Sequence, residues 1–112
     1  MASQKPPLIV IRSPAAIDEL NDIWRWNAER YSLPHADEYL LYLTEFIADL
    51  SRNYLIGKTI SARPNLRYVL VRRRVSGHGH VVVYRFDDKE VRILHIFHTA
   101  QDWENKLQEE MP

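Results

Sequence analysis

The sequence predicts an α+β fold in which a helical hairpin packs on a four-stranded, largely antiparallel sheet. The expected two-layer order is β-α-α-β-β-β, with an optional short helix at the C-terminal end. Three observations support this prediction: apolar residues recur at helical spacing in the first half, apolar runs of strand length follow in the second half, and short polar turns separate those runs. Each half has an apolar side to bury, so the two halves are expected to face each other as layers.

The first half of the chain predicts one strand and two helices. The β-branched run from Leu8 to Arg12 is typical of a strand. Ser13-Pro14 then indicates a helix start, because serine caps the first amides and proline suits the first helical position. Ser32-Leu33-Pro34 separates two apolar stripes at helical spacing, and Gly57 is the expected C-cap of the second helix. The stripes are Ile17, Leu20, Trp24, Ala28 and Tyr31, then Ala36, Leu40, Leu43, Ile47, Leu50 and Tyr54.

The second half predicts three strands that form an antiparallel meander. Their expected ranges are Leu66 to Arg74, His80 to Phe86 and Val91 to His98. The middle run is apolar on both faces, which favours a central strand. Asp87-Asp88-Lys89 is the tight turn of a hairpin between the last two strands. Asp102 to Glu110 could form a short final helix.

The composition excludes several classes of protein but does not identify one. A length of 112 residues fits a single domain over 1–112, and 15 basic against 15 acidic residues give a formal net charge of +0. A strongly basic nucleic-acid binder is therefore excluded, and any such role must depend on a local patch. The chain has no cysteine, hence no disulfide or thiolate metal site. No apolar run is long enough to span a membrane, and we expect a cytoplasmic protein without a membrane partner.

An arginine-rich strand is the first candidate for a binding surface. The segment 63–74 contains five arginines and no acidic residue, and Arg85 follows on the next strand. Guanidinium groups suit phosphate and carboxylate oxygens, so Arg72, Arg73 and Arg74 predict an anionic partner. The alternative is a solvated strand end whose charges pair with the acids of the Asp87–Glu90 turn.

Two pairs of histidines are the second candidate. His78 and His80 lie in a Gly-rich loop, and His95 and His98 lie at the end of the last strand. No third ligand stands at a fixed spacing, so no metal site and no cofactor are predicted. An imidazole titrates near neutrality, so a general acid or base role is open, although no nucleophile accompanies it. Trp103 is expected to cover the core.

The order of these segments resembles the RelE/ParE superfamily of bacterial toxins over nearly the whole chain. The segment AIDELNDIW (16–24) is similar to the DL..IW helix of that superfamily, and Val81 to Arg85, Ile93 to His98 and TAQDW (99–103) follow in its order. The resemblance implies a toxin that a cognate antitoxin neutralises. It also implies a target, since the ParE branch poisons DNA gyrase and the RelE branch cuts messenger RNA on the ribosome.

The chain departs from the RNA-cutting pattern. Members of that branch carry an arginine just after the last strand and a tyrosine a few residues later, where this chain has Thr99 and Trp103. They also carry a basic residue early in the central strand, where His80 stands. Cleavage of RNA needs a group that activates the 2′-hydroxyl and cations that stabilise the transition state, and an indole supplies neither.

We therefore expect a ParE-like toxin that inhibits DNA gyrase without a cofactor. Two alternatives stay open: a ribosome-dependent endoribonuclease with His80 and His98 as catalytic candidates, or an inactive toxin-fold protein that only binds its antitoxin. The oligomeric state is left open. The expected functional face comprises Arg72, Arg73, Arg74, His78, His80, Arg85 and Trp103.

Overall fold

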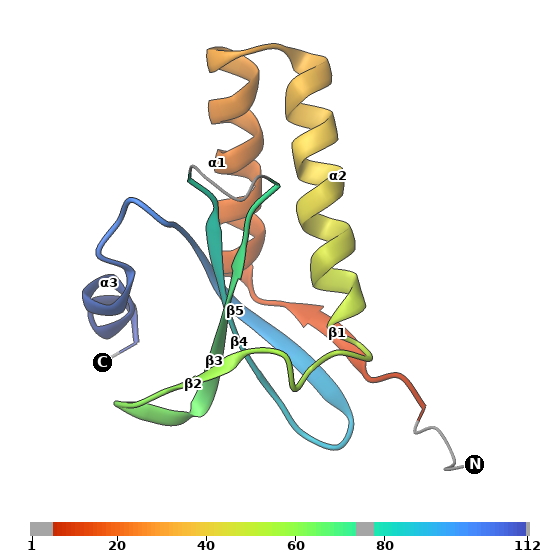
Figure 1. The fold of residues 1–112 in the computed structure, drawn as a ribbon, viewed down its shortest axis with the longest axis vertical. Coiled ribbons are helices and arrows are strands. Elements are labelled where there is room, and N and C mark those ends of the chain that lie inside the picture. The colour runs from red at the N-terminus through yellow and green to blue at the C-terminus, as the bar shows by residue number, and fades with distance from the viewer. Residues whose placement is uncertain (1–5, 74–77, 112) are drawn as a thin grey trace.

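A computed structural model describes residues 6–73 and 78–111 and confirms the α+β fold (Figure 1). The strand order in the sheet is β1-β5-β4-β3-β2. β1 runs parallel to β5, and the other neighbours are antiparallel. The elements are β1 (Ile9–Arg12), α1 (Pro14–Arg30), α2 (Leu33–Asp49), β2 (Lys58–Ile60), β3 (Arg63–Val71), β4 (His80–Phe86), β5 (Glu90–His98) and α3 (Trp103–Glu110).

The expected number of strands was wrong, because the sheet has five strands instead of four. The additional strand, β2, spans three residues and pairs with β3 through an irregular register. A strand this short has no readable alternation, so its pattern could not be recognised. β3 also begins and ends earlier than expected, since it spans Arg63–Val71 and the predicted strand ran from Leu66 to Arg74.

Side-chain caps begin both long helices where the sequence indicated. The Ser13 hydroxyl accepts from the Ala16 amide at 3.0 Å, and Ser32 accepts from the His35 amide at 3.2 Å. The end of α2 was predicted wrongly, since the helix stops at Asp49 and Gly57 is not its cap. Gly57 is needed for a close approach instead: its amide donates to the Tyr84 hydroxyl at 2.9 Å, and a Cβ atom would lie 2.5 Å from that oxygen.

The core lies on both faces of β4, which is the central strand as predicted. The helical hairpin covers one face, where Leu20, Leu43 and Ile47 pack on Val82 and Ile93. The other face is covered by α3, and its cluster comprises Ile60, Leu66, Val81, Val83, Leu94, Phe97 and Leu107 with Tyr68, Trp103 and Met111 packed against it.

The buried stripe of α1 differs from the predicted one. Ile17 and Tyr31 are 46% and 60% exposed, whereas Ala16 and Asn27 are buried. The buried stripe is set by where β5 and α2 contact the helix, and spacing alone does not specify that direction. The two helices extend past the ends of β3 and β4 (Figure 1).

Candidate functional site

A cleft of about 1250 Å³ lies between the helical hairpin and the adjoining end of the sheet. α1 and α2 line one side of it. The start of β4 and the end of β5 line the other, with contributions from the end of β3 and from α3. Several of the predicted polar residues meet in this cleft, which is larger than a second hollow at the far end of β4.

Tyr39 of α2 and His80 of β4 form a hydrogen bond inside the cleft. The Tyr39 hydroxyl lies 2.5 Å from Nδ1 of His80, whose side chain is nearly buried. Burial, and to a lesser extent the nearby Tyr42, raise the pKa of Tyr39 to about 12. Burial, with a smaller effect from His98, lowers the pKa of His80 to about 4. Both groups are therefore neutral near pH 7, so the phenol donates to Nδ1 and the imidazole proton resides on Nε2.

His98, at the end of β5, extends this arrangement. Its ring centroid is 5.3 Å from that of His80 and 5.3 Å from that of His78. Nδ1 of His98 accepts from the Ala100 amide at 3.0 Å, so its neutral ring also carries the proton on Nε2. Burial, followed by the effect of His78, lowers the pKa of His98.

Two hydrogen bonds join Gly79, just before β4, to Thr99, just after β5. The Gly79 amide donates to the Thr99 hydroxyl at 2.9 Å, and the Thr99 amide donates to the Gly79 carbonyl at 3.0 Å. A Cβ atom at Gly79 would lie 2.3 Å from the Val71 carbonyl oxygen, so no other residue fits there without movement. Glycine at this position therefore lets the His78–His80 segment lie against the end of β3.

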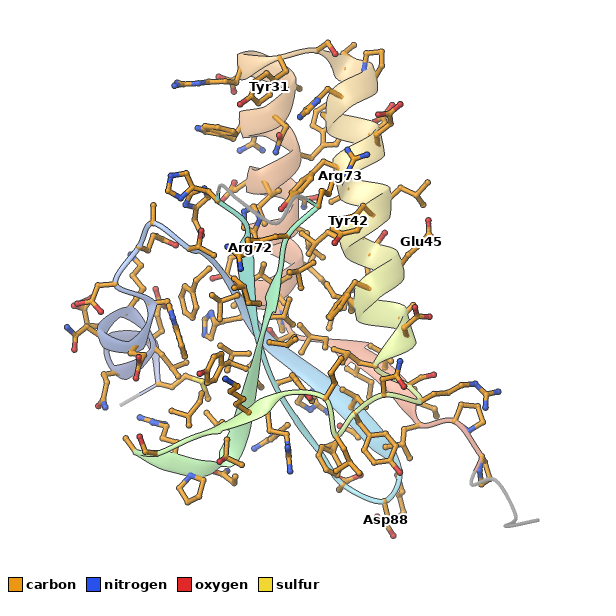
Figure 2. All side chains as sticks on the ribbon, in the orientation of Figure 1. Tyr31, Tyr42, Glu45, Arg72, Arg73 and Asp88 are labelled. Carbon is orange, nitrogen blue, oxygen red and sulfur yellow. The ribbon has the colours of Figure 1, made fainter. Side chains whose placement is uncertain are left out.

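Two arginines stand beside the cleft at the end of β3. The Tyr42 hydroxyl of α2 donates to the Arg72 carbonyl at 2.6 Å, and the Arg73 guanidinium lies 5.7 Å from the Tyr42 ring centroid. Both arginine side chains are exposed. Figure 2 shows these residues beside α2, with Tyr31 near the tip of the hairpin and Asp88 at the opposite end of the molecule.

An aromatic wall lines the hairpin side of the cleft. Trp26 is 49% exposed and packs edge-on against Tyr31, with ring centroids 6.0 Å apart. The ring centroids of Tyr31 and His35 are 4.4 Å apart, and the Arg30 guanidinium carbon lies 5.2 Å from the Trp26 ring centroid. Exposed aromatic rings beside cations are typical anchors for a protein partner.

Glu19 is a functional residue of the scaffold that sequence reasoning missed. One carboxylate oxygen lies 3.0 Å from Nδ1 of His95, and the other accepts from the Ile96 amide at 2.8 Å. This joins α1 to β5 and separates His95 from the other histidines. The only signal in the sequence was the position of Glu19 on the same helical turn as the buried Ala16 and Leu20.

The structure gathers some of the predicted site residues and separates others. Arg73, His78, His80 and His98 line the cleft, and Arg72 lies beside them at the end of β3. Arg85 lines a different, smaller hollow with Phe86 to Arg92 at the far end of β4.

Two further predicted residues lie outside this gathering. Trp103 packs on the opposite face of the sheet, 4.8 Å from the Tyr68 ring, where it covers the core as expected. Arg74 lies outside the described residues. Tyr39 was not among the predicted site residues, because its position looked like part of a core stripe.

The described residues also bear on metal and membrane binding. Over 6–73 and 78–111, no group of three or more histidine, cysteine, aspartate or glutamate side chains is arranged to hold a metal ion. Within the same part of the chain, no helix is long and apolar enough to cross a membrane.

Comparison with known proteins identifies the family. Residues 10–103 match the model of the ParE toxin of the type II toxin–antitoxin system parDE. The chromosomal ParDE toxin–antitoxin system from P. aeruginosa has a similar fold, with a TM-score of 0.68 and 18% identity over 80% of this chain and 94% of that chain.

A second solved structure, the toxin–antitoxin complex RelBE2 from Mycobacterium tuberculosis, has a TM-score of 0.52 and 23% identity over 89% of this chain and 100% of that chain. No match was found among curated proteins. The structural likenesses show a common fold, and the family model covers most of the sequence. The chain belongs to the ParE toxin family of type II toxin–antitoxin systems.

Proposed function

We propose that this chain acts as a toxin by inhibiting DNA gyrase and that a cognate antitoxin neutralises it. The observation that carries the proposal is the match of residues 10–103 to the ParE family model, which extends from β1 to the start of α3. The family assignment agrees with the departure of Thr99 and Trp103 from the RNA-cutting pattern.

The exposed residues at the cleft end of the sheet are the proposed contact with gyrase. Arg72 and Arg73 follow the end of β3, and the exposed His78 lines the cleft. Guanidinium groups form bidentate contacts with carboxylates and phosphates, so either an acidic protein surface or bound DNA would complement them. Trp103 is assigned to stability, because it packs on the second core cluster.

The antitoxin is proposed to bind in the cleft itself. The solved structures with a similar fold come from ParDE and RelBE2 toxin–antitoxin systems. In this chain the hairpin side of the cleft exposes Trp26 and Tyr31, which an amphipathic helix or an extended segment could cover. An antitoxin there would also shield Arg73 and His78, which explains how binding would neutralise the toxin.

The test is induced expression in bacteria that lack the antitoxin, followed by supercoiling assays with purified gyrase. We expect arrested growth and inhibited supercoiling for the native chain. Arg72→Ala/Arg73→Ala should reduce gyrase inhibition by about tenfold or more, since charge-assisted contacts contribute about 1.5–3 kcal/mol each. Arg52→Ala, an exposed arginine after α2, is the matched control and should leave inhibition unchanged.

Two outcomes would overturn the gyrase assignment. Growth arrest with unaffected gyrase would exclude this target. No growth defect from a folded protein would indicate an inactive toxin-fold protein whose remaining role is antitoxin binding. Circular dichroism of the double variant would show whether the arginines are needed for the fold instead.

A second candidate function has one specific observation in its favour. Tyr39, His80, His98 and Arg73 line one cleft, and such groups can transfer protons and stabilise a phosphorane. A ribosome-dependent endoribonuclease would show cleaved messages after induction, and His98→Ala would abolish the cuts. Intact messages under toxic expression would remove this candidate.

A further inference from the structure

Imidazole and cationic groups gather on the sheet side of the cleft without a carboxylate of their own. His78, His80, His98, Arg73 and Lys106 all line it. Among the described residues, the ion pairs are Arg25 with Asp22, Arg92 with Glu90, and His95 with Glu19. None of these pairs includes a group from this side of the cleft.

The acidic residues of the cleft belong to its other side. Glu19 and Asp22 come from α1, and Glu38 comes from α2. Both oxygens of Glu19 are occupied by β5, and Asp22 pairs with Arg25. The cleft is therefore divided into an acidic and aromatic wall, on the hairpin side, and a floor, on the sheet side, to which the described residues contribute no carboxylate.

The hydrogen bonds of His80 and His98 leave the same atom of each ring available. Nδ1 of His80 accepts from Tyr39, and Nδ1 of His98 accepts from the Ala100 amide. Neither Nε2 atom has a partner among the described residues, yet no buried side-chain nitrogen or oxygen there lacks one. Within the described part of the chain, both Nε2–H groups are left as donors on residues that line the cleft, and the bonds at Nδ1 set the tautomer of each ring.

We propose that His80 and His98, with His78, Arg73 and Lys106 around them, form a subsite that binds a carboxylate side chain of the antitoxin. The inference depends on the proposed function, because it assumes that an antitoxin occupies the cleft. Both oxygens of a carboxylate accept hydrogen bonds. They therefore complement the two Nε2–H donors and the nearby cations. The acidic residue would thereby anchor the antitoxin segment at the floor while apolar residues cover Trp26 and Tyr31.

The different charges on the two sides of the cleft favour a peptide with an acidic residue over a nucleic acid. A phosphate backbone carries a negative charge at every nucleotide and would meet Glu38 on the opposite wall. A peptide can instead place one acidic residue at the floor and apolar or basic residues against that wall. The formal net charge of +0 agrees with this choice, since the chain has no general attraction for nucleic acid.

Two substitutions at one position separate the donor role from a structural role. In His98→Asn, the amide oxygen can replace Nδ1 as the acceptor for Ala100, and the Nε2 donor is lost. In His98→Gln, the amide nitrogen can occupy the place of Nε2, and the acceptor for Ala100 is lost. The proposal predicts that His98→Asn binds the antitoxin about tenfold more weakly, whereas His98→Gln retains most of the affinity. A purely structural histidine would give the opposite order.

The experiment measures the Kd of the full chain for the small protein encoded directly beside it, by isothermal titration calorimetry. Arg52→Ala is the control, because Arg52 is exposed after α2 and is not among the residues that line the cleft. Each acidic residue of that protein is also replaced by its amide. One of these replacements should show no further loss when combined with His98→Asn, which identifies the bound carboxylate.

Each outcome decides the proposal. Unchanged affinity of His98→Asn with an intact complex would overturn the subsite and leave the proposed function standing. No binding of the native chain would overturn both. Tight binding of a single-stranded oligonucleotide that His98→Asn abolishes would reassign the floor to phosphate groups, against the proposal.

Discussion

Histidines occupy two regions of β4 and β5 that differ in what holds them. In the first region, His95 is buried beside Glu19, whose carboxylate also binds the Ile96 amide. In the second, His80 and His98 are fixed by a phenol and an amide, and among the described residues neither pairs with a carboxylate. A buried carboxylate that accepts from both an imidazole and a backbone amide joins two elements of the fold. Imidazoles that are not paired with a carboxylate still have N–H groups that can donate to another molecule. His95 and His98 are close in the sequence, yet they have different roles in the structure.

Removing the acid of the first region should give the largest effect on stability. Glu19→Ala leaves the His95 ring and the Ile96 amide without a partner, which should lower the free energy of unfolding by about 3 kcal/mol. Urea denaturation measures this loss. Glu38→Ala, at an exposed position in the same cleft, should change it by less than about 0.5 kcal/mol. Equal effects of the two substitutions would contradict the distinction between the regions.

Lowering the pH should reduce the stability that neutral His80, in the second region, contributes to the native chain. The folded-state pKa of His80 is about 4, below its ordinary value of 6.5, so the unfolded chain binds the extra proton more readily. The stability contributed by neutral His80 is complete above pH 6.5 and is lost as the pH falls towards 4. Between pH 7 and pH 4.5 the free energy of unfolding should fall by about 2 kcal/mol from this group.

The control for this pH effect is His80→Asn, whose amide oxygen can still accept from Tyr39. The variant has no titrating ring, so its loss of stability over the same interval should be smaller by a similar amount. Parallel pH profiles of the two proteins would show that His80 is not buried as a neutral group.

The smallest predicted effect concerns the phenol that fixes His80. Tyr39→Phe leaves Nδ1 of a nearly buried ring without a donor and should cost about 1 kcal/mol. Tyr42→Phe should cost less, because the Arg72 carbonyl that it frees is at an exposed site and can bind water. Hydrogen exchange should show faster opening of the first half of α2 in Tyr39→Phe. Equal exchange in both variants would contradict this role for Tyr39.

Much of the fold was predictable because its signals are local. Ser13 and Ser32 cap the helices as expected, and the Asp87 carboxylate accepts from the Lys89 and Glu90 amides, which makes the predicted hairpin turn. The range His80–Phe86 was predicted with its central position. The candidate site was predictable only in part, since Arg73, His78, His80 and His98 meet in the cleft whereas Arg85 and Trp103 do not.

By itself, the sequence determined the order of all elements except β2, the caps, the hairpin turn and the resemblance to the family, because each depends on neighbours within a few residues or on a linear pattern. Only the tertiary structure decided that Tyr39 meets His80 across 41 positions and that Glu19 meets His95 across 76. Such contacts depend on how layers pack and on which side of a helix faces the sheet. A polar residue on a helical stripe has no local feature that reveals its distant partner, so these contacts appear only when the chain is folded.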